Sequence, residues 1–210
     1  MKNIIFLFVV FLGATKVLAQ FDPEAEVLLE KMSEKYQGKK AFTSGFNQNL
    51  INEASNINEN IEGIIHVKGD KYRLEIAGQI IFNDSENIWS YNQEAKEVTV
   101  TLYDPEEEEI SLNNIWNLYK QGYKYGLNEN DSEGNWVVDL EPIKRGSQNF
   151  YKIRMSISPS IDLLGFVIFE DSGNKFEYVI NQLRDRSDLN DDFFTFDLSQ
   201  YPGVELIDFR

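Results

Sequence analysis

The stretch Leu163-Leu164-Gly165-Phe166-Val167-Ile168-Phe169 is apolar almost throughout. A strand in an antiparallel sheet that has one solvated face alternates between apolar and polar side chains, and this stretch does not. Other strands share the property, since Ile64 points away from Ile65 and Ile81 points away from Ile80. We infer a large sheet that is apolar on both sides and curls around an apolar interior. A fully packed barrel or sandwich without a cavity fits the same pattern.

Runs with a period of two continue on both sides of that stretch. The gaps between the runs are short and rich in Gly, Asn and Asp, which is typical of hairpins in an antiparallel meander. A short extended tail follows around 204–207. We expect eleven strands, at 42–50, 61–67, 72–76, 79–82, 87–91, 97–103, 123–127, 136–140, 151–156, 163–169 and 176–183.

A helix is expected before the first strand. Asp22 is a good N-cap, Pro23 suits the first turn, and Gly38 is a stop signal. One face of this helix is apolar, with the spacing of a single buried stripe: Ala25, Leu28, Leu29, Met32 and Tyr36.

A second, short helix is expected between the sixth and seventh strands. Ser111 can cap it and Gly122 ends it, and its apolar face carries Leu112, Ile115, Trp116 and Tyr119. We therefore predict a mainly β fold with α elements: an unclosed antiparallel half-barrel whose two helices form a lid over an apolar cavity. A plain crossover helix packed on the core is the alternative for the second helix.

The first nineteen residues have the pattern of a secretory signal peptide. A basic start is followed by nine apolar residues at 4–12, too few to span a bilayer, and 17–19 fit a cleavage site. We expect a signal peptide at 1–19 and a single domain at 20–210, because no repeat or linker interrupts the rest.

Composition excludes several function classes. The formal net charge is −15, and it becomes −17 when Lys2 and Lys16 leave with the signal peptide. This excess argues against nucleic acid and anionic lipid surfaces as partners. The absence of Cys and the presence of one His argue against thiolate or histidine metal sites and Ser-His-Asp catalysis.

No residue pattern indicates an enzyme, a metal or a cofactor. His66 is isolated on a strand, and the acid runs at 104–109 and 188–192 lack the spacing of an EF-hand loop. A pair of carboxylates for hydrolysis remains an alternative in a chain with 35 acids, although no pair stands out.

An ordered set of short motifs resembles the periplasmic outer-membrane lipoprotein carriers of the LolA type. The set covers nearly all of the chain after the signal peptide. It comprises the motifs FTSGFNQ at 42–48, EGII at 62–65, KYRLE at 71–75, IIFND at 80–84, IWSY at 88–91, EVTV at 97–100, FTFD at 194–197 and YPGVELI at 201–207.

The resemblance implies a shuttle for acylated lipoproteins in the periplasm. Such a protein takes a lipoprotein from an inner-membrane ABC-type release complex, shields its acyl chains and delivers it to an outer-membrane acceptor. It implies no enzymatic activity and no cofactor, and we expect a monomer. Arg73 matches the arginine that, in this family, latches the lid in the empty state.

The candidate lining of the cavity and lid follows from the strand and helix faces together with the resemblance. The chain departs from the family at Lys68-Gly69 and in the acidic run 106–109, so receptor contacts are not carried over. A related binding module for another lipid or hydrophobic cargo is the alternative function. The candidates are Leu28, Leu29, Met32, Phe46, Ile65, Trp89, Leu112, Ile115, Trp116, Tyr119, Phe166 and Ile168.

Overall fold

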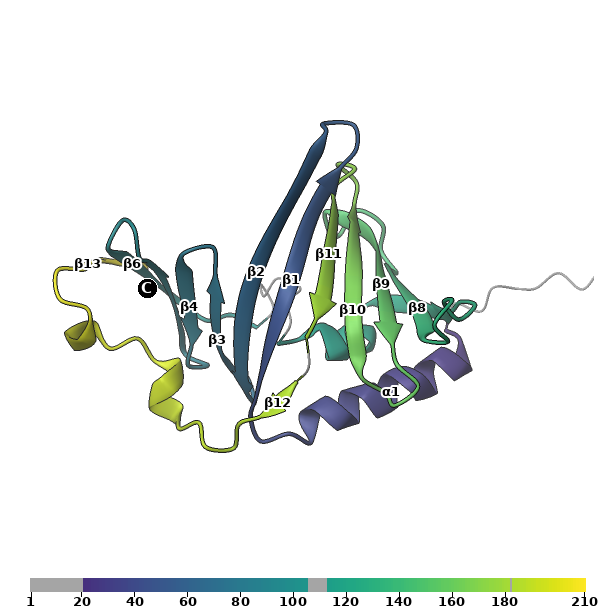
Figure 1. Cartoon of the computed structure of the whole chain (residues 1–210), viewed down its shortest axis with the longest axis horizontal. Coiled ribbons are helices and arrows are strands. Elements are labelled where there is room, and N and C mark those ends of the chain that lie inside the picture. The colour runs from purple at the N-terminus through teal and green to yellow at the C-terminus, as the bar shows by residue number, and fades with distance from the viewer. Residues whose placement is uncertain (1–20, 106–112, 182) are drawn as a thin grey trace, which may run out of the picture.

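The computed structural model describes residues 21–105, 113–181 and 183–210. Its strands form one highly curved sheet, and helix α1 (Pro23–Gln37) runs across one side of it (Figure 1). The expected signal peptide, the acidic run 106–109, the cap Ser111 and the lid residue Leu112 lie outside the described residues.

All eleven predicted strands are present. They are β1 (Phe42–Asn52), β2 (Ile57–Lys68), β3 (Lys71–Ile76), β4 (Gln79–Asn83), β5 (Asn87–Asn92), β6 (Glu97–Leu102), β7 (Tyr123–Leu127), β8 (Trp136–Pro142), β9 (Phe150–Ile157), β10 (Leu163–Glu170) and β11 (Lys175–Ile180).

The strand order follows the chain in two meanders. β6 to β1 lie side by side in reverse order, β1 pairs with β11, and β11 to β7 complete the sheet. Pairing within this series is antiparallel throughout. The sheet does not close, because β6 and β7 stand at opposite ends of the series (Figure 1). The predicted unclosed antiparallel half-barrel is confirmed.

Helix α1 forms as its sequence predicts. The Asp22 carboxylate accepts hydrogen bonds from the backbone N–H groups of Glu24 (2.9 Å) and Ala25 (3.4 Å), and Gly38 follows the last turn. Leu29 and Met32 are fully buried against the sheet. The side of the sheet that faces α1 is called the concave face below, and the opposite side is the outer face.

The second helix differs in form from the prediction. The described part is a 3-10 helix, η1 (Ile115–Lys120), preceded by Asn113 and Asn114. Asparagine side chains favour turns over helix interiors, which explains why helical spacing in the sequence overestimates the regular helix here. Ile115 and Trp116 are buried, as their spacing predicted.

The C-terminal segment supplies a covering layer of which the sequence predicted only the extended tail around 204–207. It contains β12 (Arg184–Asp185), η2 (Asp191–Phe194), η3 (Leu198–Gln200) and β13 (Glu205–Asp208). β12 pairs with β1, and β13 pairs in parallel with β6 at the edge of the sheet. Between these strands, Phe196 packs on an outer-face cluster that includes Phe82 and Tyr91. The second face of the sheet is therefore covered over β4 to β6 by the chain's own end.

Elsewhere the outer face remains partly open to solvent. Ile64 and Val179, which lie on this face of β2 and β11, are 44% and 52% exposed. The apolar residues on both faces of these strands therefore do not all lie in a core.

Candidate functional site

The concave face of the sheet holds the main apolar cluster of the described residues. Ten of the twelve predicted lining residues belong to this cluster or pack against it. They come from α1, η1 and the strands β1, β2 and β10. They are Leu28, Leu29, Met32, Phe46, Ile65, Ile115, Trp116, Tyr119, Phe166 and Ile168.

One part of the concave face is fully packed. Under α1, several inward side chains of β8 and β9 have no exposed surface, including Leu140, Ile153 and Met155. Phe46 lies against Gly63 of the neighbouring strand. A Cβ atom at position 63 would stand 2.4 Å from the Phe46 ring, so any larger residue there would displace the ring.

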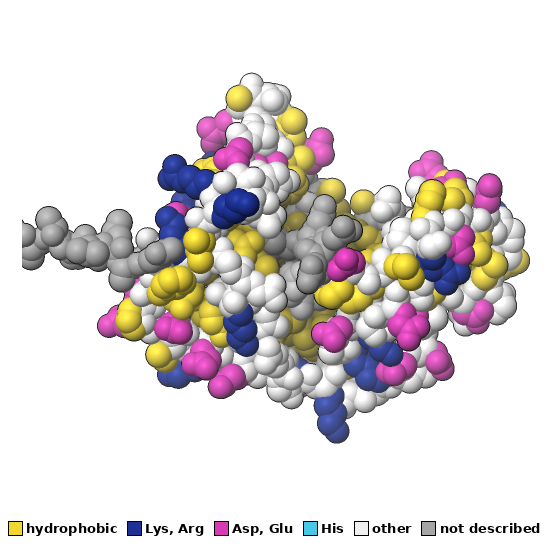
Figure 2. All heavy atoms as spheres, turned by 180° about the vertical axis from the view of Figure 1, so that it is seen from behind, with side chains coloured by type: hydrophobic (Ala, Val, Ile, Leu, Met, Phe, Trp, Pro, Cys, Tyr) yellow, Lys and Arg dark blue, Asp and Glu magenta, His cyan; other side chains and the backbone are white. Residues whose placement is uncertain are grey.

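A second part of the concave face is only half covered. Its apolar side chains pack on the buried cluster but keep partial exposure, and they come from β3, β11 and η1. Seen from behind, hydrophobic side chains gather around the middle of the molecule (Figure 2). We call this set the apolar rim: Tyr72, Leu74, Ile76, Phe176, Ile180, Leu118 and Tyr119.

The joint between α1 and η1 is partly polar, and sequence reasoning missed it. Asn117 accepts hydrogen bonds from Ser33 (Oγ to Oδ1, 2.7 Å) and from Gln37 (Nε2 to Oδ1, 2.8 Å). Lys120 in turn donates to Ser33 (3.0 Å), which is almost fully buried. Polar residues at helix surfaces are common, so the sequence does not single these residues out. The network becomes visible only once α1 and η1 are placed side by side.

An aromatic stack lies beside the polar joint. The Tyr36 ring stacks on Trp116, and its hydroxyl accepts a hydrogen bond from the Leu163 backbone N–H at 3.0 Å. Burial raises the pKa of Tyr36 above its usual value. One residue of α1 thus contacts both η1 and β10.

Arg73 and Trp89 do not lie with the other predicted site residues. Trp89 packs on the outer-face cluster with Phe82 and Phe196, because strand pairing puts it opposite Phe82. This placement corrects the expectation that Trp89 lines the cavity: alternation groups residues on a face without saying which face meets the helix.

Arg73 also lies on the outer face, opposite His66 of β2 and Phe82 of β4. Its guanidinium carbon lies 5.0 Å from the Phe82 ring centre and 4.8 Å from that of Phe193, and its Nη2 pairs with Glu75 at 2.9 Å. The structure therefore brings Arg73 to the C-terminal segment, and α1 and η1 lie across the sheet from it.

His66 lies beside Arg73 under the same segment. Its ring meets Phe193 edge to face at 4.9 Å, and its Nδ1 is 2.7 Å from the Thr43 hydroxyl. Burial lowers the pKa of His66 below its usual 6.5, while the Glu75 charge acts in the opposite direction. We find no catalytic partner for it among the described residues, and its surroundings favour a neutral imidazole.

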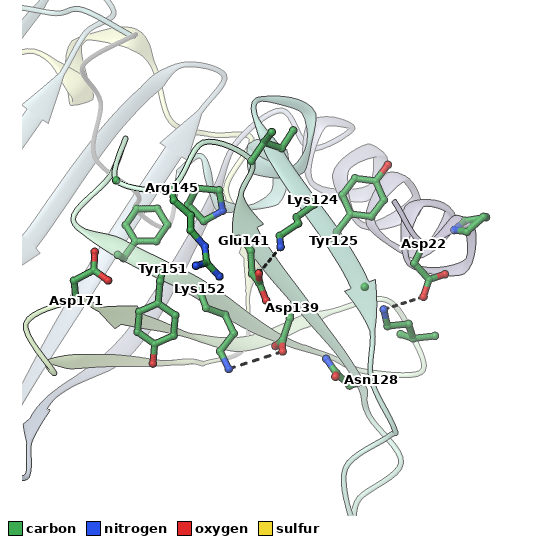
Figure 3. Close-up of a pocket in the computed structure, with 17 residues that line it drawn as sticks. Asp22, Lys124, Tyr125, Asn128, Asp139, Glu141, Arg145, Tyr151, Lys152 and Asp171 are labelled. Atoms are coloured by element: carbon green, nitrogen blue, oxygen red, sulfur yellow. Dashed lines mark hydrogen bonds and ion pairs between the residues drawn. The ribbon is translucent and has the colours of Figure 1, made fainter. Parts of the chain in front are cut away.

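A groove of about 1410 Å³ lies along β7 to β9, and its lining combines charged and apolar side chains (Figure 3). Lys124 pairs with Glu141 at 2.8 Å, and Lys152 lies 4.0 Å from Asp139. At one end the Asp22 carboxylate accepts from the Leu127 backbone N–H, which lowers the pKa of Asp22. By strand alternation these ion-paired side chains lie on the face opposite Leu140 and Ile153 of the buried cluster. This groove is therefore not the predicted apolar cavity, which stays a prediction.

The described ranges lack a membrane-spanning helix and a cluster of metal-binding side chains. No helix in 21–105, 113–181 or 183–210 is long and apolar enough to cross a membrane. The same ranges contain no group of three or more His, Asp or Glu side chains arranged to hold a metal ion.

Solved structures of other proteins resemble this chain at low sequence identity. An uncharacterized conserved protein from Thermus thermophilus shares the fold, with a TM-score of 0.59 at 12% identity, covering 88% of this chain and 99% of that one. A LolA superfamily protein from Nitrosomonas europaea gives 0.42 at 17% identity, covering 83% and 98%. A DUF1329 family protein from Desulfovibrio piger gives 0.49 at 11% identity, covering 85% and 98%.

The family comparison is more specific than these superpositions. No curated protein is detectably similar to the chain. The sequence profile described as "Outer membrane lipoprotein carrier protein LolA" matches residues 37–197, which extend from the end of α1 to the aromatic segment over β4 and β5. The chain belongs to the LolA family of outer membrane lipoprotein carriers.

Proposed function

We propose that this chain is a periplasmic carrier that binds the acyl chains of lipoproteins and moves them from the inner to the outer membrane. The apolar rim is the observation that carries the proposal, because it offers half-covered apolar surface next to a fully packed core. Burial of an acyl chain stabilises a complex by roughly 0.8 kcal/mol per CH₂ group, so partial shelter of one chain is a large contribution.

A carrier must also release its cargo, and the joint between α1 and η1 suits that need. Its polar contacts through Asn117 and Lys120 can exchange with water at small net cost, since a hydrogen bond contributes only about 0.5–1.5 kcal/mol. In this proposal η1 moves relative to α1 as acyl chains enter beneath Leu118 and Tyr119. Closed and open states of similar free energy then allow both uptake and delivery.

The remaining parts of the proposal follow from family membership and the sequence. A signal peptide at 1–19 directs export, and residues 20–210 act as one carrier domain that works as a monomer. Its partners are acylated lipoproteins, an inner-membrane ABC-type release complex and an outer-membrane acceptor. No catalytic step is part of this role.

The experiment that tests the proposal is release of lipoproteins from spheroplasts. The purified mature chain is incubated with spheroplasts that retain labelled lipoproteins, and the label in the soluble fraction is measured. We expect release with the wild-type chain and loss of release with Leu74→Arg, which puts a charge on the apolar rim. Val179→Arg on the exposed outer face is the matched control and should release normally.

Other outcomes would contradict the carrier role. If no lipoprotein is released while phospholipid copurifies with the chain, the protein binds another cargo. If Leu74→Arg and Val179→Arg behave alike, the apolar rim is not the binding surface.

A further inference from the structure

The concave face becomes more polar from β3 towards β6. Strand pairing gives the concave-face residues directly: Leu74 of β3 lies opposite Ile81 of β4, Ile81 opposite Ser90 of β5, and Ser90 opposite Thr99 of β6. β3 is apolar at every concave position, whereas β5 and β6 present mainly hydroxyl and amide groups there. The apolar rim therefore has a polar margin along one side.

The outer face explains why that margin can be polar. On β4 to β6 most apolar side chains other than Ile81 and Ile88 point outward. Several of them are buried beneath the C-terminal segment, among them Ile80, Tyr91 and Val98. These strands obtain their packing from the outer face, so their concave positions need no apolar residues for stability. A polar concave surface at this place is then available for a ligand.

Asn83 stands at the boundary between the two surfaces. Pairing puts it beside Tyr72 of β3 and Ile88 of β5 on the concave face. Its side chain is fully buried, and its Oδ1 accepts a hydrogen bond from the Ser85 backbone N–H at 2.7 Å. Its Nδ2 has no acceptor in the part of the chain that the structure describes.

An unpaired buried amide donor is unusual, because such groups are nearly always hydrogen-bonded in folded proteins. The usual exceptions include groups that are satisfied by a ligand. An acceptor arriving from the apolar rim would meet the Asn83 Nδ2 at the point where the apolar side chains end.

We propose that Asn83 donates a hydrogen bond to a carbonyl oxygen of the diacylglyceryl group of a bound lipoprotein. This inference rests on the proposed function and adds an orientation to it. The ester carbonyls are the first acceptors above the acyl chains. With the chains against Leu74 and Ile76, the carbonyls lie at Asn83 and the peptide extends past Ser90 and Thr99 to solvent.

The test compares two ligands that differ only in those carbonyls. One is a synthetic peptide with a dipalmitoylglyceryl group on its N-terminal cysteine, and the other is its dialkyl ether analogue. Binding to the mature chain is measured by displacement of a fluorescent fatty acid. We expect the ester ligand to bind about fivefold to tenfold more tightly than the ether ligand, the effect of one hydrogen bond.

Asn83→Asp removes the donor and keeps the oxygen that caps the Ser85 turn. We expect this variant to bind both ligands equally. Asn92→Asp is the matched control, because the Asn92 Oδ1 also caps a turn, at Glu94 and Ala95, but lies at the far end of β5. It should keep the ester preference. If Asn83→Asp does not fold, Asn83→Ala serves as a second variant, because its methyl side chain has no hydrogen-bond donor.

The outcomes separate this inference from the proposed function. If the wild-type chain binds neither ligand, the carrier role itself is contradicted. If it binds both equally, or if Asn83→Asp keeps the preference, acyl binding stands and the role of Asn83 is wrong. Diester and diether phosphatidylglycerol identify the source of the carbonyl, and an Asn83-dependent preference confined to phospholipid would overturn the assignment to a lipoprotein.

Discussion

The ring of Trp116 lies parallel to the ring of Tyr36, with their centroids 4.9 Å apart and their planes within 9°. Because Tyr36 is on α1 and Trp116 on η1, the stack joins the two helical elements that cover the concave face. The Tyr36 hydroxyl extends beyond the stack to the backbone of Leu163 at the start of β10. This contact ties α1 to the sheet as well as to η1.

Removing the Tyr36 hydroxyl should weaken the fold while leaving the stack. Tyr36→Phe leaves the buried Leu163 N–H without its acceptor, and an unsatisfied buried donor costs about 1–3 kcal/mol. Urea unfolding followed by fluorescence should show a free energy of unfolding lower by that amount. Tyr151→Phe, at a tyrosine that is 52% exposed, should change it by less than about 0.5 kcal/mol. Equal effects of the two variants would show that the contact to β10 is unimportant.

Loss of Asn117 should loosen η1 from α1. Asn117→Ala deletes the acceptor for both Ser33 and Gln37, so η1 should open more often. We expect faster amide exchange in 115–120 and faster uptake of a fluorescent fatty acid, with a loss of about 1–2 kcal/mol in stability. Asn149→Ala, in the exposed loop just before β9, should alter neither rate. An uptake rate that stays the same in Asn117→Ala would mean that cargo does not enter past η1.

Arg73 should act on the C-terminal segment. Arg73→Leu removes the cation between the Phe82 and Phe193 rings, an interaction worth about 1–2 kcal/mol when partly buried. Hydrogen exchange should become faster in 190–204 and stay unchanged in α1 and η1. Arg73→Lys should give a smaller effect, because an ammonium lacks the planar face that stacks on aromatic rings. Faster exchange in α1 or η1 would instead support the lid latch that the family resemblance implies.

Stability should fall as the pH drops below about 6.5, and His66 should be the cause. Burial lowers its folded-state pKa, so the unfolded chain binds a proton that the folded chain does not. The destabilisation starts near the unfolded value of 6.5 and continues down to the lower folded pKa. Carboxylates with a lowered pKa, such as Asp22 and Asp162, change the stability only near and below pH 3.8. They therefore do not affect stability in the pH range where His66 titrates.

His66→Asn provides the comparison for that prediction, since its amide can still pair with Thr43. Urea unfolding at several pH values between about 5 and 7.5 should show a slope for the wild-type chain and little slope for the variant. His66 is the only histidine in the sequence, so a slope of the same size in both proteins would assign the effect to other groups.

The fold was largely predictable because its signals are local. Alternation located the eleven strands, and the cap at Asp22 and the stripe from Leu28 to Tyr36 located α1. Burial of the candidate residues on α1 was predictable for the same reason, since α1 can bury only its apolar stripe. Alternation alone did not decide whether the sheet closes into a barrel, and the family resemblance predicted that it does not.

The faces of Trp89 and Arg73 were harder to predict. Their positions depend on pairing register across five strands and on a C-terminal segment without periodic pattern. The one available signal was composition: four aromatic residues fall within 193–201, which is more than an exposed loop usually carries and indicates packing on the sheet. They are Phe193, Phe194, Phe196 and Tyr201. The polar network at Asn117 gave no signal, because single polar residues on helices are common.

A sheet that does not close has two edge strands with unpaired backbone groups, and each can pair with a strand from another molecule. In this chain β13 pairs with β6 and so occupies one of these edges. At the other edge, Phe21 forms a β-bridge to Tyr125 of β7. Residues 205–208 thus block self-association through the β6 edge, while the segment before them covers the outer face. A truncation before Glu205 would uncover the β6 edge, and fibrous or swapped assemblies would be its expected products.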